Sequence, residues 1–163
     1  MGSFFAYLKR SRDFGALLGF FIVVVFVLTA LSAPLLVSWE SVTQVSLENA
    51  LRPPSHDHLL GTDEMGRDLL RRIVWGARIS LVVAILSVGL SLAAGVLIGG
   101  MAGYYEGRFS FFIMRVMDSL IAFPRILIAL VLITIMGTGI VSLTTAIGLS
   151  TIPIFARLIR GPV

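Results

Sequence analysis

Four long apolar runs, separated by short polar segments, constrain this chain more than any other feature of its sequence. The first run extends from Phe14 to Val37 without a charged residue, and a helix of about 20 apolar residues is enough to cross the hydrocarbon core of a bilayer. Only 13% of all residues are charged, against about 25% in soluble domains. So few polar residues could not cover a soluble core of this size. The sequence therefore predicts an all-α membrane protein with about four transmembrane helices.

The apolar runs also predict how the chain is divided. Residues 1–13 are expected to form a cytoplasmic N-terminus, 14–37 the first transmembrane helix, 38–78 an extracytoplasmic loop, and 79–163 three further spans at about 79–103, 117–136 and 140–156. A cleaved signal peptide is the alternative for the first run, but that run is longer than the usual apolar core of about 7–15 residues. The positive-inside rule favours this orientation, because basic residues are more numerous in the segments expected inside, namely Lys9, Arg10, Arg12, Arg108, Arg115, Arg125, Arg157 and Arg160.

The polar segment between the first two runs ends in an amphipathic pattern. Pro53-Pro54 excludes a regular helix in its middle, but beyond Thr62 the apolar residues recur at spacings of three and four, namely Leu69, Leu70, Ile73, Val74 and Ala77. We therefore predict a short amphipathic helix at the outer membrane surface. Its expected cap is Thr62 or Asp63, and its expected i,i+4 ion pairs are Asp63–Arg67 and Asp68–Arg72.

Small and charged residues within the spans predict helix contacts. Ser87, Ser91, Gly95, Gly99 and Gly103 follow one another at intervals of four in the second span. This spacing lets helix backbones approach closely, so Gly95, Gly99 and Gly103 are interpreted as packing residues rather than as solute contacts.

The start of the third span and the residues just before it supply two further candidates. Arg115 and Asp118 are three residues apart and are predicted to form a structural or gating pair, with a solvated pair at a helix end as the alternative. Pro124 should kink the helix or mark its first turn.

Several separated motifs occur together in one order. They are His58-Leu59-Leu60-Gly61-Thr62-Asp63-Glu64-Met65-Gly66-Arg67-Asp68, Gly76-Ala77-Arg78-Ile79-Ser80-Leu81, Gly103-Tyr104-Tyr105, Met114–Asp118, Phe123-Pro124 and Ala156–Arg160. This combination resembles the second permease subunit of dipeptide, oligopeptide and nickel ABC importers. That family has six transmembrane helices, of which this chain supplies about four. Residues 79–163 then resemble the start of the permease domain, and the family's ATPase-coupling loop with the two spans after it is absent, so a truncated or partial chain is expected. Ile152 also stands where the family often has tryptophan.

The resemblance implies a function and partners. With a homologous permease, the subunit would form the pathway for peptides or a similar small solute across the bacterial or archaeal cytoplasmic (inner) membrane. Two ATPase subunits would bind ATP and Mg, since this chain lacks the Gly-x-x-x-x-Gly-Lys-Ser/Thr phosphate loop, and an extracytoplasmic solute-binding protein would deliver the solute. No cofactor and no catalytic residue are therefore expected here. The substrate is not identified by the sequence.

The resemblance also implies an extracytoplasmic signature. Its residues are Gly61, Thr62, Asp63, Gly66, Arg67 and Asp68. Arg67 and Asp68 are candidates for contact with the binding protein or the neighbouring permease, and anchoring of the loop to the membrane surface is the alternative role.

Other functional classes find less support. An inactive truncated fragment or a helical membrane scaffold without transport activity is the main alternative. A metal enzyme would need more than His56-Asp57-His58, since the sequence has no cysteine and no His-Glu-x-x-His helix. A channel would need a filter motif or an arginine ladder. The net charge of +4 does not indicate nucleic-acid binding, because the basic residues flank apolar runs and form no patch.

Overall fold

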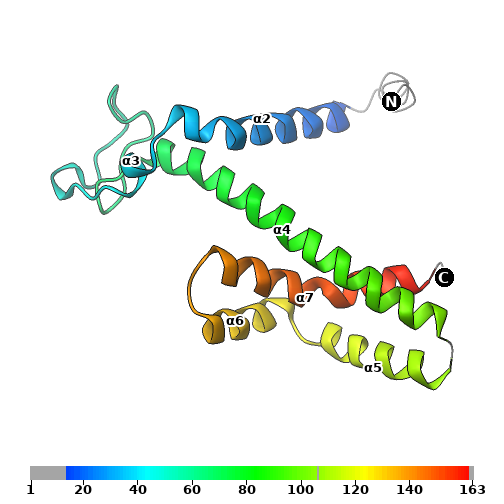
Figure 1. The fold of residues 1–163 in the computed structure, drawn as a ribbon. Coiled ribbons are helices and arrows are strands. Elements are labelled where there is room, and N and C mark those ends of the chain that lie inside the picture. Colours follow the sequence, from blue (N-terminus) through cyan, green and yellow to red (C-terminus); the bar gives the residue numbers. More distant parts are fainter. Residues whose placement is uncertain (1–13, 106, 162–163) are drawn as a thin grey trace. The chain divides into compact units, whose positions relative to one another are not determined.

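The computed structural model describes residues 14–105 and 107–161, and the regular elements of this part are helical apart from one isolated bridge between Thr62 and Asp68. The helices are α2 (Phe14–Leu36), α3 (Trp39–Thr43), the 3-10 helix η1 (Leu47–Asn49), α4 (Leu69–Tyr104), α5 (Arg108–Ala122), α6 (Arg125–Met136) and α7 (Ile140–Arg160) (Figure 1). The predicted all-α class is confirmed. By length and composition α2, α4 and α7 could each cross a membrane, and α5 with α6 would add a fourth span if that bent pair is one span.

The chain divides after Leu81 into two compact units, with α4 contributing its first turns to one unit and the rest of its length to the other. In the first unit, α2 is apolar on all sides, and only Ala30 and Ala33 are buried. A helix that exposes apolar side chains all round is stable in lipid rather than in water.

Aromatic side chains connect the end of α2 to the start of α4 through a hydrogen bond and a ring contact. The indole nitrogen of Trp75 donates a hydrogen bond to the carbonyl oxygen of Val37 at 2.9 Å. The rings of Trp39 and Trp75 meet edge to face with centroids 5.5 Å apart, and the Arg78 guanidinium lies 5.5 Å from the Trp75 ring centroid. These contacts combine apolar burial with one satisfied indole N–H, which is the usual arrangement for tryptophan at a polar boundary.

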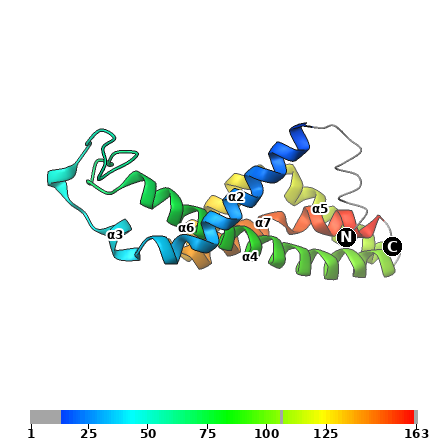
Figure 2. The ribbon, with the colours of Figure 1, turned by 90° about the horizontal axis from the view of Figure 1, so that it is seen from above.

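In the second unit, small residues bring α4 against α7, and the two helices lie side by side in both views (Figures 1 and 2). The Ser87 hydroxyl donates to the Thr144 carbonyl oxygen at 3.1 Å. The Ser91 hydroxyl lies 2.8 Å from the Gly148 carbonyl oxygen and 2.7 Å from that of Ser87. Both serines are almost fully buried. Hydrogen bonds of this kind require close backbones, because a serine side chain is short.

The predicted amphipathic helix begins later than expected and is continuous with the span that it was predicted to lead into. Residues 62–68 are not helical, and α4 begins at Leu69 and continues unbroken to Tyr104. The reason is that Gly61 and Gly66 have positive φ angles, which a right-handed helix does not contain. The amphipathic residues from Leu69 to Ala77 therefore form the first turns of the long helix, which also contains the whole of the predicted second span.

The third and fourth predicted spans also differ in detail from the structure. Helix begins at Arg108, nine residues before the start predicted at Met117, and it breaks at Phe123 and Pro124, where α5 and α6 meet at 92°. The last helix, α7, extends to Arg160 rather than Ala156 and contains Pro153. Both α5 and α6 pack on α7.

Candidate functional site

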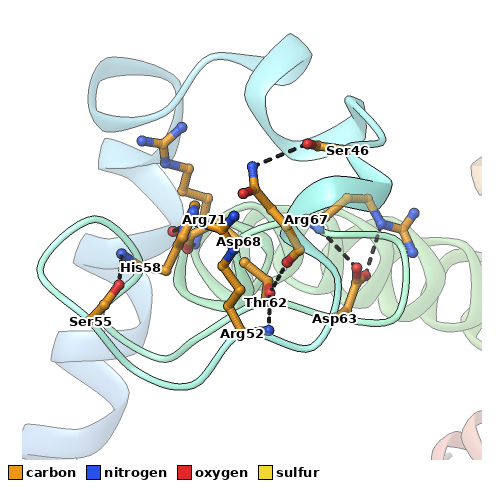
Figure 3. Close-up of polar contacts among 10 residues, drawn as sticks. Ser46, Arg52, Ser55, His58, Thr62, Asp63, Arg67, Asp68 and Arg71 are labelled. Carbon is orange, nitrogen blue, oxygen red and sulfur yellow. Dashed lines mark hydrogen bonds and ion pairs between the residues drawn. The ribbon is translucent and has the colours of Figure 1, made fainter.

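The six signature residues lie together in a folded loop directly before α4 (Figure 3). Thr62 is at its centre and is only 5% exposed. The Thr62 hydroxyl accepts a hydrogen bond from the Arg52 N–H at 2.8 Å and donates one to the Asn49 carbonyl oxygen, while the Thr62 N–H donates to the Arg52 carbonyl oxygen at 3.1 Å. Thr62 therefore ties the segment after η1 to the segment that enters α4.

Two glycines permit this close approach of backbones. Gly61 has φ +77°, and a Cβ atom there would lie 2.6 Å from the Arg52 carbonyl oxygen. Gly66 has φ +72°, and a Cβ atom there would lie 1.8 Å from the Ser46 carbonyl oxygen. Any other residue would combine an unfavourable backbone conformation with a backbone clash, so both positions require glycine.

Asp63 organises the turn between these glycines. Its Oδ1 accepts hydrogen bonds from the N–H groups of Met65 and Arg67, each at 2.9 Å, and its Oδ2 accepts one from Arg67 Nε at 2.8 Å and another from Arg72. The sequence predicts the Asp63–Arg67 pair in a helix, and it occurs in a turn instead. Burial alone would raise the pKa of Asp63, but the hydrogen bonds and charge of Arg67, together with the Met65 N–H, hold that pKa below its ordinary value.

Asp68 caps the long helix. Its Oδ1 accepts the Arg71 N–H at 3.0 Å, and its Oδ2 lies 3.0 Å from Nδ1 of His58. The side chain is 7% exposed. Burial would raise the pKa of Asp68, yet the Arg71 N–H, the His58 ring and the charge of the Arg71 guanidinium hold it below its ordinary value. Asp68 thus has the capping role predicted for Thr62 or Asp63. The predicted Asp68–Arg72 pair is wrong, because Asp68 turns back to the loop and Arg72 pairs with Asp63.

Because the pKa values of Asp63 and Asp68 are lowered in the folded loop, we predict that the loop loses stability only at low pH. A carboxyl group with a lowered pKa in the folded state stabilises the fold above its unfolded pKa of about 3.9, and this contribution is lost as the pH falls through the lower folded value. The fluorescence of Trp39 and Trp75, which are the two tryptophans of the chain, should therefore stay constant from pH 7 to about pH 4 and change below it. Asp63→Asn should weaken the acid transition, and a wild-type transition that begins near pH 6 would contradict this assignment.

A polar pocket opens beside the signature residues. Its volume is about 220 Å³, and its lining comes from α3, the segment around η1, the signature loop and the first turn of α4. The lining residues are Ser41, Gln44, Ser46, Asn49, His58, Gly66, Arg67, Asp68 and Arg71. Hydrogen-bonding side chains of several types therefore converge on one small volume outside the apolar helices.

Two of the three packing candidates in α4, Gly95 and Gly99, lie against α7. A Cβ atom on Gly95 would lie 2.4 Å from that of Phe155, and one on Gly99 would lie 2.4 Å from the Ala156 carbonyl oxygen. Gly103 is half-buried in the last turn of α4. Pro124 precedes the first residue of α6 at the break with α5, beside a second pocket of about 220 Å³ whose lining includes Arg125 and Ser150.

Asp118 pairs with a residue other than the predicted one. Its Oδ1 lies 3.4 Å from Nη2 of Arg157 in α7, and in the part of the chain that the structure describes no ion pair joins it to Arg115. The reason is that Asp118 continues the stripe of α5 that contains buried Ser110 and Met114, whereas Arg115 lies on the exposed side of that helix. The side chains of Asp118 and Arg157 are 44% and 62% exposed, so their pair contributes at most about 1 kcal/mol.

Sequence reasoning misses the partners of His58 and Arg72. The sequence offers His58 as a metal ligand with His56 and Asp57, but among residues 14–105 and 107–161 no group of three or more such side chains could hold a metal ion. The distance of ten residues between His58 and Asp68 gives no periodic signal, because it depends on the path of the loop. That path depends on the positive φ angles at Gly61 and Gly66, which spacing does not reveal.

No protein-family model matches the chain. Comparison with known proteins finds permease proteins of peptide and glutathione transport systems. The chain is 40% identical over 159 residues to the dipeptide transport system permease protein DppC of Alkalihalophilus pseudofirmus, a match that covers 98% of this chain and 51% of that protein. It is 40% identical over 139 residues to the glutathione transport system permease protein GsiD of Pectobacterium atrosepticum, covering 85% of this chain and 46% of that protein. Against the di/tripeptide transport system permease protein DppC of Pseudomonas aeruginosa it is 39% identical over 159 residues, covering 94% and 52%. The chain thus spans about half the length of the curated relatives it matches.

Proposed function

Because this chain belongs to the family of permeases of bacterial ABC peptide and glutathione importers, we propose that it helps to form the pathway of an ATP-driven importer for small peptides. The observation that carries the proposal is the identity of about 40% along nearly the whole chain with permeases whose names specify dipeptides, di- and tripeptides and glutathione. These compounds share peptide bonds, a free amino group and carboxylates. Small peptides are therefore the proposed class of solute.

The proposed assembly follows from what a permease needs. The chain pairs with a homologous permease around the pathway, two ATPase subunits supply the energy, and a solute-binding protein delivers the peptide. In the proposed orientation, the residues before α2 lie in the cytoplasm and the loop between α2 and α4 faces outward. The even distribution of exposed apolar side chains on α2 supports a lipid-facing position for that helix.

Transport by the complete complex tests this function. The experiment reconstitutes the full permease, its partner permease and both ATPases in liposomes. ATP is enclosed in the liposomes and the binding protein is added outside. Uptake of radiolabelled dipeptide and of glutathione is then measured. We expect uptake that needs both additions and stops when the ATPase phosphate-loop lysine is replaced. An intact complex that hydrolyses ATP but accumulates neither solute would reject the proposal in favour of a scaffold or a different cargo.

A further inference from the structure

The pocket of about 220 Å³ before α4 is lined by Arg71, whose charge helps to lower the pKa of Asp68. Arg71 is exposed and lines the pocket. Within residues 14–105 and 107–161, its guanidinium group makes no side-chain hydrogen bond or ion pair, whereas Arg67 and Arg72 both pair with Asp63. A guanidinium group has five N–H donors and can bind a carboxylate through two parallel hydrogen bonds, in a bidentate geometry.

The two carboxylates of the signature accept hydrogen bonds from groups other than the Arg71 guanidinium. Asp68 uses Oδ1 for the Arg71 backbone N–H and Oδ2 for His58, as Figure 3 shows. Asp63 accepts four hydrogen bonds from Met65, Arg67 and Arg72. None of these hydrogen bonds uses the Arg71 guanidinium group, so its N–H donors remain available to a ligand in the pocket.

The remaining lining favours an acceptor from outside. The Gln44 side chain also has no hydrogen-bond partner among the residues that the structure describes, and it lines the same pocket with the hydroxyl-bearing Ser41 and Ser46. An amide N–H₂ and a guanidinium fork are both donors for carboxylate oxygens. The volume is below the roughly 300 Å³ at which sites for small molecules begin, so it suits one protruding side chain better than a whole peptide.

We propose that this pocket receives an aspartate or glutamate side chain of the solute-binding protein, with Arg71 and Gln44 as its donors. The inference rests on the orientation given under the proposed function, because the pocket must face the compartment in which the binding protein moves. It assigns the docking contact to Arg71 instead of Arg67 and Asp68, whose side chains serve the loop itself. Placing the donor on the first turn of α4 couples docking directly to a long transmembrane helix.

Charge variants of the complete transporter in nanodiscs test the pocket. The dissociation constant of the peptide-loaded binding protein should rise about tenfold for Arg71→Gln, the loss expected for one interfacial charge contact, and rise further for Arg71→Glu. Arg71→Lys should lie between the wild type and Arg71→Gln. Arg52→Gln and Arg52→Glu are matched controls on the same loop, because the one hydrogen bond of the Arg52 guanidinium within residues 14–105 and 107–161 goes to the Glu48 carbonyl oxygen, and Arg52 does not line the pocket. They should change the constant less than twofold.

Three readouts separate the outcomes. Equal affinities for Arg71→Gln and Arg52→Gln, with unchanged tryptophan fluorescence and normal uptake, would overturn the docking inference and leave the proposed function intact. A defect of Arg71→Gln that disappears when the binding protein carries a peptide with an amidated C-terminus would overturn it as well, because the pocket would then take the carboxylate of the solute. A wild-type complex that neither binds the binding protein nor transports peptide would instead reject the proposed function.

Discussion

The Gly66→Ala variant is expected to lose the folded loop before α4 and, under the proposed function, transport by the complete importer. The added Cβ atom would lie 1.8 Å from the Ser46 carbonyl oxygen and 2.7 Å from the carbonyl carbon. Both are backbone atoms, so no change of side-chain rotamer relieves the clash. The φ angle of +72° adds about 1–2 kcal/mol of strain for alanine. The two effects together should destabilise the loop by more than about 2 kcal/mol.

Loss of this loop would affect several connections at once. Ser46 donates its N–H to the Met65 carbonyl oxygen at 3.0 Å, and a displaced Ser46 cannot keep this bond. The pocket lined by Ser46, Gly66 and Arg71 would change shape. The Asp68 cap of α4 would also lose its fixed neighbour His58. One methyl group should therefore affect the backbone hydrogen bonds, the pocket and the helix start together.

Limited proteolysis of the purified transporter measures the effect. In Gly66→Ala the segment 46–68 should be cut at least tenfold faster than in the wild type, and the fluorescence of Trp39 and Trp75 should shift. Gly76→Ala is the matched control, since Gly76 lies in α4 with nothing within 4 Å of an added methyl group, and alanine is the better helix former. A Gly66→Ala protein as resistant to protease as Gly76→Ala would show that the loop tolerates the clash.

The helices are predictable from the sequence because apolar periodicity is a local property. The charge-free run from Phe14 forms α2 within one residue of its expected end at Val37, and the four-residue spacing of Ser87, Ser91, Gly95 and Gly99 identifies residues that the structure places against α7. A spacing of four places side chains on one helix face whatever the partner helix is. The partner, α7, is not identified by this pattern, because the spacing carries no information about what covers the face.

The loop is only partly predictable, because its contacts depend on backbone conformations that residue spacing does not reveal. The signature residues lie in one loop of the structure, yet their spacing predicts the start of a helix. An i,i+4 pair such as Asp63–Arg67 has the same sequence in a helix and in this turn. The two glycines inside the pattern, each about 1 kcal/mol unfavourable in a helix interior, are the signal against a helix. The partner of Asp118 is missed for a related reason, since a contact with Arg157 requires knowledge of how α5 packs on α7.

Separation of α4 from α7 is the expected result of a second glycine change, Gly99→Ala. A Cβ atom at this position would lie 2.4 Å from the Ala156 carbonyl oxygen and 3.1 Å from the Ala156 Cα atom. These are again backbone atoms, and α7 would have to move away by several tenths of an ångström. Overpacking of this kind costs about 1–3 kcal/mol, and movement of α7 would also lengthen the bonds from Ser87 and Ser91 to α7.

The adjacent residue supplies a strict control, because Gly100 has nothing within 4 Å of an added methyl group. In detergent, Gly99→Ala should lower the midpoint of thermal unfolding by several degrees, whereas Gly100→Ala should leave it unchanged or raise it, since alanine is favoured over glycine in a helix by up to about 1 kcal/mol. Hydrogen exchange should rise in α7 around Gly148 and Ala156 in the first variant only. If the two variants unfold at the same temperature, the close contact at Gly99 does not stabilise the packing of α4 on α7. The expected difference would show that the close packing at Gly99 helps to hold α4 against α7.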